Sequence, residues 1–349
     1  MQAMRVDHRP LPKLNSLILP WPVNWTALFG AERPLIVEIG FGRGAFLRHL
    51  AALYPNANIV GLEISNQCLV KAENAIAREG LHNVRVIHSR AETALHHLFE
   101  PETIAQLHVN FPDPWFKRGH SHRRLMQRDT LDAIVSRLAP GGHFFLATDI
   151  LAYAQMSAGL LRAAPGLTNQ LDADWADALP NRIVTKYEAK ALAEGRRCYY
   201  FHYRRNNCPA PIVPVIKDWP MPHCVLTVPL SLEAIAEAFT PFTTTDRRCA
   251  DMAGEQAAQD LTVSFMAVYR GGGSLLFEIH ASEPTIEQHT ALVLTEHRRT
   301  PGEYTLQLSS IGHPRPTRGM HLAVETLSRW LTSLHPEASI RSYKIQSAE

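Results

Sequence analysis

Short apolar runs alternate with longer amphipathic segments along the first part of the chain. Strand-like runs lie at residues 34–40, 58–64, 84–89, 104–111 and 143–149, and helix-like segments lie between them at 45–55, 66–80, 94–99 and 131–140. Strands that are separated by helices pair in parallel, and the connecting helices then cover both faces of the sheet. The pattern therefore predicts an α/β fold with a doubly wound, largely parallel sheet.

The pattern changes in the last third of the chain. Strand-like runs at 224–230, 261–269 and 274–281, a short helix at 232–239 and two further strands precede a final helix that opens at Thr317. That helix repeats apolar residues on one face, at Met320, Val324, Leu327, Leu331 and Leu334. Such a stripe is expected to cover one face of an antiparallel sheet, so this part is predicted to be a smaller, appended α+β domain.

A proline-rich stretch separates the two patterns. Prolines at positions 209, 211, 214, 220 and 222 would interrupt either a helix or a central strand. We therefore predict one domain at residues 1–205, a linker at 206–221, and a second domain of unknown role at 222–349.

Composition limits the class of protein but does not indicate a function. The 349 residues are 46% hydrophobic and 19% charged, which suits two folded cores, and a net charge of +2 is too mild to indicate nucleic-acid binding by itself. The five cysteines are scattered and no targeting segment opens the chain, so a reducing cytoplasm is expected. No apolar run approaches the roughly 20 residues of a membrane helix. No Cys/His spacing typical of a metal site occurs, so none is predicted.

The first candidate site is the segment "VEIGFGRGAF" at residues 37–46. Gly40, Gly42 and Gly44 would let the chain turn from strand to helix and approach a ligand closely. The spacing is G-x-G-x-G rather than the dinucleotide pattern G-x-G-x-x-G, and Glu38 at the strand end would repel a pyrophosphate but attract an amino group. S-adenosylmethionine fits better than NAD. Glu63, about 20 residues further on, is placed to accept hydrogen bonds from ribose hydroxyls.

The second candidate site is "VNFPDPWFKRGHSHRRLMQ" at residues 109–127. Prolines on both sides of Asp113 restrict the backbone around one carboxylate, and a basic run follows that includes Lys117, Arg123 and Arg124. A conformationally restricted carboxylate next to a run of basic residues suggests a nucleic-acid substrate. The loop loosely resembles the Asn/Asp-Pro-Pro-aromatic loop of amino-methyltransferases, but Asp113 interrupts the proline pair. Alternatively, Asp113 only stabilises a turn and the basic run only forms a solvent-exposed helix face, so that neither has a functional role.

Five motifs in order carry a more specific resemblance, namely "EIGFGRG", "GLEIS", "FPDPWFKRGHSHRR", "ATD" and "TKYE". Across roughly residues 20–205 the chain resembles the bacterial tRNA (guanine-N7-)-methyltransferase family. The resemblance implies a Rossmann-like class I methyltransferase fold for residues 1–205, S-adenosylmethionine as cofactor, and tRNA as substrate and partner. The C-terminal region lies outside it.

The resemblance also implies roles for individual residues. Glu38 and Glu63 match the cofactor-binding acids, and Asp113 matches a catalytic aspartate that also borders the cofactor. Arg90 stands where the family often has an acid or Asn, so the adenine contact is expected from the backbone of Arg90 and Ala91 or from Glu92. The predicted substrate contacts are Lys117, Asp149, Thr185, Lys186, Tyr187 and Glu188, with Arg123 and Arg124 from the basic run.

Guanine N7 carries a lone pair and no proton, so its methylation needs no general base. Alignment of the reacting atoms and a carboxylate that favours the developing cationic purine would suffice, and Asp113 suits both tasks. The alternatives are an amino-methyltransferase acting on a nucleobase or protein, and a non-catalytic tRNA-binding protein that retains the fold. The appended domain could add stability, a dimer contact, or a tRNA grip through Arg298, Arg299, Arg315 and Arg318. The oligomeric state is left open.

Overall fold

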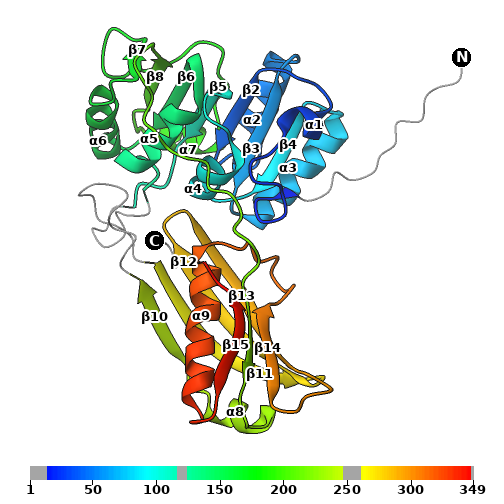
Figure 1. Cartoon of the computed structure of the whole chain (residues 1–349). Coiled ribbons are helices and arrows are strands. Elements are labelled where there is room, and N and C mark those ends of the chain that lie inside the picture. The colour runs from blue at the N-terminus through cyan, green and yellow to red at the C-terminus, as the bar shows by residue number, and fades with distance from the viewer. Residues whose placement is uncertain (1–13, 116–123, 247–260, 347–349) are drawn as a thin grey trace, which may run out of the picture. The chain divides into compact units, whose positions relative to one another are not determined.

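A computed structural model describes residues 14–115, 124–246 and 261–346 of the chain (Figure 1). The chain divides between Ile216 and Lys217 into two compact units, here called unit 1 (residues 1–216) and unit 2 (residues 217–349). Each unit has its own sheet and its own hydrophobic core. The boundary falls inside the predicted linker, and the limits predicted for the domains stay a proposal.

Unit 1 is built on an eight-stranded sheet with the order β1-β4-β3-β2-β5-β6-β8-β7. The strands are β1 (Leu14–Asn15), β2 (Leu35–Ile39), β3 (Asn58–Glu63), β4 (Val84–His88), β5 (Ile104–Asn110), β6 (Leu138–Thr148), β7 (Leu167–Asn169) and β8 (Tyr199–Arg205). The pairs from β1 to β6 are parallel, whereas β8 pairs antiparallel with both β6 and β7. The predicted α/β fold is thus confirmed, with an antiparallel edge that the pattern did not indicate.

Helices follow most of these strands (Figure 1). They are α1 (Trp25–Phe29), α2 (Ala45–Leu53), α3 (Asn66–Glu79), α4 (Ala91–Thr93), the π-helix η1 (Ala94–Leu98), α5 (Arg128–Arg137), α6 (Leu151–Arg162) and α7 (Lys186–Ala193). Phe46 and Leu47 of α2 pack with Ile36 and Ile59 in one core cluster, so α2 is anchored directly after the glycine turn. The predicted helix at 131–140 ends earlier, because β6 already begins at Leu138.

Residues 213–216 of the proline-rich stretch are hydrogen-bonded to unit 1. Arg137 is fully buried and donates hydrogen bonds to the carbonyls of Val213 (2.8 Å) and Pro214 (3.3 Å). The amide of Ile216 donates to the carbonyl of His96 at 2.9 Å. Because a buried guanidinium needs these acceptors, residues 213–216 are part of the unit 1 fold.

Unit 2 is an antiparallel sheet with the order β10-β11-β12-β13-β14-β9-β15 and two described helices. Its elements are β9 (His223–Thr227), α8 (Leu232–Ala238), β10 (Phe242–Asp246), β11 (Leu261–Gly271), β12 (Ser274–Glu283), β13 (Ile286–Glu296), β14 (Glu303–Leu308), α9 (Arg318–Ser333) and β15 (Ser339–Lys344). Its first residues are held by the Arg315–Asp218 ion pair and by the amide of Trp219, which donates to the Pro316 carbonyl at 2.8 Å.

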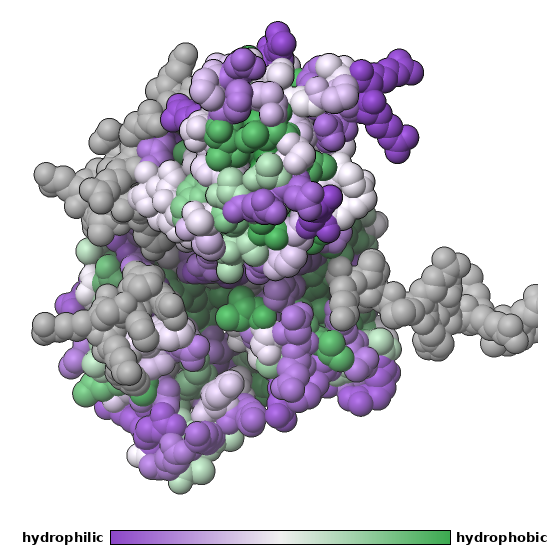
Figure 2. All heavy atoms as spheres, turned by 90° about the horizontal axis from the view of Figure 1, so that it is seen from below, coloured by the Kyte–Doolittle hydropathy of each residue, from purple (hydrophilic) through white to green (hydrophobic). Residues whose placement is uncertain are grey.

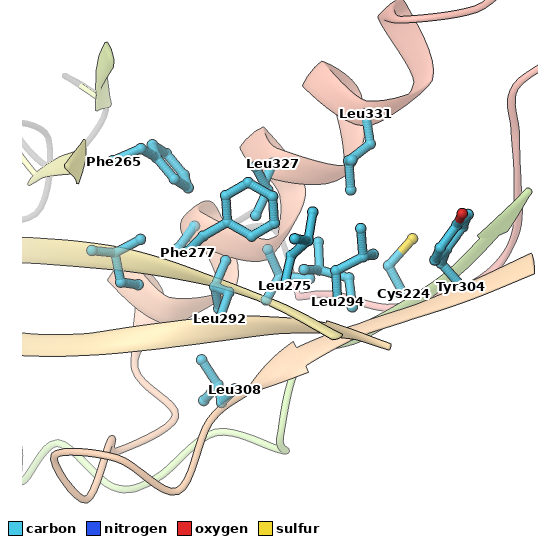
Figure 3. Close-up of a cluster of buried hydrophobic side chains, with 14 of the residues drawn as sticks. Cys224, Phe265, Leu275, Phe277, Leu292, Leu294, Tyr304, Leu308, Leu327 and Leu331 are labelled. Carbon is cyan, nitrogen blue, oxygen red and sulfur yellow. The ribbon is translucent and has the colours of Figure 1, made fainter. Parts of the chain in front are cut away.

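The apolar stripe of α9 packs on one face of this sheet, as predicted. Met320, Val324, Leu327 and Leu331 are fully buried, and Leu334 is partly buried. Figure 3 shows Leu327 and Leu331 of the helix lying toward side chains of the strands, Phe277 among them. The α+β character of the appended region is therefore confirmed. Strand β15 was not predicted, because all six of its residues are exposed and no apolar alternation marks them.

Hydrophobic and hydrophilic side chains are both found on the surface. On the face that Figure 2 displays, hydrophobic residues (green) are interspersed with hydrophilic ones (purple), as is usual for folded proteins. Among the helices of residues 14–115, 124–246 and 261–346, none is long and apolar enough to cross a membrane.

Candidate active site

The glycine turn connects β2 to α2 at the carboxyl edge of the parallel strands. Gly40, Gly42 and Gly44 have φ angles of 72°, 56° and 76°, in the left-handed region that favours glycine. A Cβ atom at Gly44 would lie 3.0 Å from Cβ of Ala72 in α3, so this glycine permits close helix packing. A Cβ at Gly40 or Gly42 would meet no described atom within 4 Å. The turn therefore leaves room for a ligand to approach its backbone.

Glu63, the last residue of β3, braces this turn. Its Oε2 accepts a hydrogen bond from the amide of Gly42 at 2.9 Å, and its Oε1 accepts from the amides of Ile64 (2.9 Å) and Ser65 (3.0 Å). A carboxylate has about four acceptor positions, so about one remains. A ribose hydroxyl can donate to it, which is the role predicted for Glu63.

Glu38 lies in the middle strand of the sheet and is only 2% exposed. Its Oε1 accepts a hydrogen bond from the side-chain amide of Asn110 at 3.1 Å, whereas its Oε2 is buried with no hydrogen-bond partner among the described residues. Burial raises the pKa of Glu38 to about 7, an effect that the Asn110 hydrogen bond and the positive charge of Arg182 partly offset. A buried, unpaired acceptor of this kind fits the amino group of S-adenosylmethionine.

Asp113 lies in the loop after β5 and is exposed. The loop holds two aromatic residues in left-handed backbone conformations, Phe111 at φ 52° and Trp115 at φ 42°. Each such residue is strained by about 1–3 kcal/mol, and strain of this size persists where the surroundings enforce it. The guanidinium of Arg124 supplies one such restraint, since its Nε donates to the carbonyl of Pro114 at 3.1 Å and its Nη2 to that of Trp115 at 3.2 Å.

The predicted basic run is described only in part. Lys117 and Arg123 lie outside the described residues, so their predicted tRNA contacts stay predictions. Arg124 is described and holds the Asp113 loop, which is a role that the sequence did not indicate. Its predicted contact with tRNA likewise stays a prediction.

The "TKYE" stretch separates into two kinds of residue. Thr185 and Glu188 form the capping box of α7, in which each side chain accepts a hydrogen bond from the other residue's backbone amide. Glu188 is also buried, whereas Lys186 and Tyr187 are exposed. Lys186 and Tyr187 are therefore the members of this stretch whose side chains are accessible to a substrate.

Asp149 follows β6 at the same sheet edge and forms an ion pair with Arg196. Arg196 also contacts Glu194 at 2.6 Å, so the two acids share one guanidinium. In the segment after β4, Arg90 and Glu92 form an ion pair at 3.6 Å, and Ala91 opens α4. The predicted substrate role of Asp149 and the cofactor roles of residues 90–92 stay predictions.

Sequence reasoning missed three residues of this site, namely Asn110 as a partner of Glu38, Arg182, and Arg196. The Asn110 position carried a signal, because it directly precedes the F-P-D-P-W motif. Arg182 and Arg196 carried none, since the partners that place them at this site, Asn110 and Asp149, are distant in the sequence. The capping box had a readable T-x-x-E spacing. Within the described residues, no three His, Cys, Asp or Glu side chains come together as a metal site.

Sequence comparisons with known proteins agree with this geometry. A family model described as "Putative methyltransferase" matches residues 32–201. The tRNA (guanine-N(7)-)-methyltransferase of Cupriavidus metallidurans is 38% identical over 189 residues, which are 53% of this chain and 72% of that protein. The protein of the same name from Geobacter metallireducens is 35% identical over 193 residues, 55% of this chain and 92% of that protein. The solved structure of the 16S rRNA methyltransferase KamB covers 52% of this chain and 92% of its own, with 16% identity and a TM-score of 0.39.

The sheet, the glycine turn and the two strand-end acids define a methyltransferase that depends on S-adenosylmethionine. More narrowly, the chain belongs to the tRNA (guanine-N(7)-)-methyltransferase family. The family model ends at residue 201, within unit 1.

Proposed function

We propose that the chain transfers a methyl group from S-adenosylmethionine to N7 of a guanosine in tRNA. The observation that carries the proposal is the buried, unpaired Oε2 of Glu38 beside the open face of the Gly40–Gly42 turn. The Asp113 loop supports it from the end of the neighbouring strand β5. Names of the relatives agree with this assignment.

The residues of the chain bind and align the two substrates. Glu38 is placed to accept a hydrogen bond from the cofactor's amino group, and Glu63 one from a ribose hydroxyl. Bound S-adenosylmethionine supplies a methyl group activated by a positively charged sulfur. Arg124 and the strained loop hold the carboxylate of Asp113 outward, where it can accept hydrogen bonds from N1–H and the N2 amino group of guanine. These contacts orient N7 and favour the positive charge that develops on the purine.

Lys186 and Tyr187 are proposed to contact tRNA next to this site, together with Lys117 and Arg123 from the F-P-D-P-W segment. For unit 2 we propose a structural role first. Two of the four arginines considered for a tRNA grip are already paired, Arg315 with Asp218 and Arg318 with Asp246. A tRNA substrate and scattered cysteines support a cytoplasmic location.

The test is to incubate unmodified tRNA with the full chain and labelled S-adenosylmethionine, and then to treat it with borohydride and aniline, which cleave RNA at N7-methylguanosine. We expect cleavage at a single guanosine that depends on both chain and cofactor. Incorporated label without cleavage would instead support the amino-methyltransferase alternative. Binding of tRNA without incorporation would support the non-catalytic one.

A further inference from the structure

Arg182 lies between two aromatic rings in unit 1. Its guanidinium carbon is 4.7 Å from the ring centre of Phe46 in α2 and 5.2 Å from that of Tyr200 in β8. The side chain is only 9% exposed, so the two rings and the burial leave it little freedom to move. Arg182 thus has a fixed position beside the sheet edge, although it comes from the loop before α7.

The guanidinium reaches Glu38 through one intermediate residue. Nη2 of Arg182 donates a hydrogen bond to the side-chain oxygen of Asn110 at 2.9 Å, and the side-chain nitrogen of Asn110 donates to Oε1 of Glu38 at 3.1 Å. This chain fixes the orientation of the Asn110 amide, because its oxygen must face Arg182 and its nitrogen must face Glu38. It also determines that Oε1 of Glu38 accepts the hydrogen bond from Asn110, whereas Oε2 stays unpaired.

Nη2 of Arg182 also lies near a second buried acid. Glu188 lies 4.0 Å from Nη2 of Arg182 and accepts a hydrogen bond from the hydroxyl of Tyr200 at 2.6 Å. When both acids are ionised, Glu38, Arg182 and Glu188 together carry one net negative charge in a buried place. A positively charged ligand group would offset this charge, and the unpaired Oε2 of Glu38 is the buried acceptor that could receive its N–H.

We propose that Arg182 is a positioning residue for the cofactor: acting through Asn110, it favours the ionised form of the Glu38 carboxyl group and turns its free oxygen toward the ammonium group of S-adenosylmethionine. The proposal deepens the proposed function and rests on it. It also links the "TKYE" segment to the cofactor site, because Glu188 of α7 contacts the same guanidinium. Arg182 touches neither the methyl group nor the guanine in this account.

The charges around Glu38 determine in which direction its pKa changes when Arg182 is replaced. Arg182 and the Asn110 hydrogen bond lower the pKa of Glu38, whereas burial and the nearby Glu63 raise it. The remaining titratable groups interact with Arg182 rather than with Glu38. They are Glu188, Tyr200, Cys198 and His108, and burial keeps His108 neutral by lowering its pKa to about 3. Loss of the arginine charge therefore raises the pKa of Glu38 further, so that a smaller fraction of this carboxyl group is ionised at neutral pH.

The test is isothermal titration of S-adenosylmethionine into the full chain and into the variant Arg182→Met, from pH 6 to pH 9. Methionine keeps an apolar stem between the two rings but removes the charge and the hydrogen bond. If the pKa of Glu38 rises by about one unit, the ratio of variant to wild-type Kd is about tenfold at pH 6 and falls to about one at pH 9. The titration of the ligand's own amino group cancels in this ratio.

Arg197→Met is the matched control. Arg197 also stacks on a tyrosine, with its guanidinium carbon 5.6 Å from the ring centre of Tyr199, and it also pairs with an acid, Asp177. It lies outside the network, so its Kd ratio is expected to stay near one at every pH. Should Arg182→Met fail to fold, Asn110→Leu interrupts the same chain nearer to Glu38 and predicts the same pH-dependent ratio.

A ratio for Arg182→Met that is equal at all pH values, whether large or near one, would overturn the proposal. It would show that Arg182 only supports packing or does nothing for the cofactor. Failure of the wild-type chain to bind S-adenosylmethionine would overturn the proposed function instead, and the two outcomes are distinguished by the wild-type titration alone.

Discussion

Each unit of the chain holds a glutamate near the end of a strand, and the two carboxylates have different surroundings. Glu283, the last residue of β12, accepts hydrogen bonds from the hydroxyl of Thr317 and the amide of Gly319 at the start of α9. Glu38 in β2 has one oxygen without a partner. Burial raises the pKa of both. One carboxylate is thus used to begin a helix, and the other remains available to a ligand.

The same difference extends to other polar groups. Among the described residues, the buried side-chain atoms without a hydrogen-bond partner all belong to unit 1, those of Glu38, Arg182 and Arg196 among them. In unit 2 the buried Gln288 is bonded at both ends, to Thr317 and Arg315. An unpaired buried polar group destabilises a fold, and at Glu38 a bound ligand would satisfy it. The contrast supports a binding role for unit 1 and a structural role for unit 2.

The largest expected effect concerns Asp113. Asp113→Asn keeps the shape of the loop and removes the charge, so methyl transfer should fall by roughly 10²–10³ while the affinity for S-adenosylmethionine changes much less. Single-turnover transfer of labelled methyl to tRNA at saturating cofactor measures this. A variant within threefold of wild type would limit Asp113 to shaping the loop.

The next effect separates the two units. Chains cut after Ile216 and after Asn206 both lack unit 2, but only the shorter one removes the carbonyls of Val213 and Pro214 from Arg137. Each lost hydrogen bond to a charged group costs about 1.5–3 kcal/mol, so the loss of two should make the shorter chain less stable in urea unfolding by about 3–6 kcal/mol. The longer one should bind the cofactor like the full chain. Equal unfolding free energies would show that residues 207–216 are a free linker.

The features predictable from the sequence were those set by local pattern. The glycine turn and the stripe of α9 follow from spacing along one short segment, and the acids at 38 and 63 follow from their places at the ends of two successive strands. The contacts that Arg137, Arg182 and Arg196 make with Val213, Asn110 and Asp149 span tens of residues, so no local pattern marks them. Strand β15 pairs through its backbone and exposes its side chains, which leaves no hydrophobic signal to read.

A smaller effect compares the surfaces of the units. Lys186 in unit 1 and Arg299 in unit 2 are both exposed, and we expect only Lys186 to meet tRNA phosphates. Lys186→Ala should therefore reduce the dependence of log affinity on log salt concentration by about one unit, and Arg299→Ala should leave it unchanged. Filter binding of tRNA across a salt series measures both slopes. A reduced slope for Arg299→Ala would restore the tRNA grip to unit 2.

The comparison of Glu38 with Glu283 also predicts how the stability of the chain depends on pH. A carboxyl group with a pKa raised to about 7 binds more protons in the folded state than in the unfolded one, so it lowers stability as the pH rises from about 4.5 to 7. Glu38→Gln should remove this loss and stabilise the chain at pH 8 by about 1–3 kcal/mol. Glu283→Gln should instead destabilise it, because Glu283 accepts hydrogen bonds from Thr317 and Gly319 at the start of α9 and the single oxygen of an amide is a poorer acceptor for both.

The most direct test measures thermal stability and S-adenosylmethionine affinity for these two variants side by side at pH 8. The account predicts that Glu38→Gln is more stable than wild type yet binds the cofactor more weakly by about 1–3 kcal/mol, the contribution of a charge-assisted hydrogen bond. Glu283→Gln should be less stable and should bind it as wild type does. A Glu38→Gln variant that loses stability and keeps full cofactor affinity would contradict the assignment of this carboxylate to the ligand.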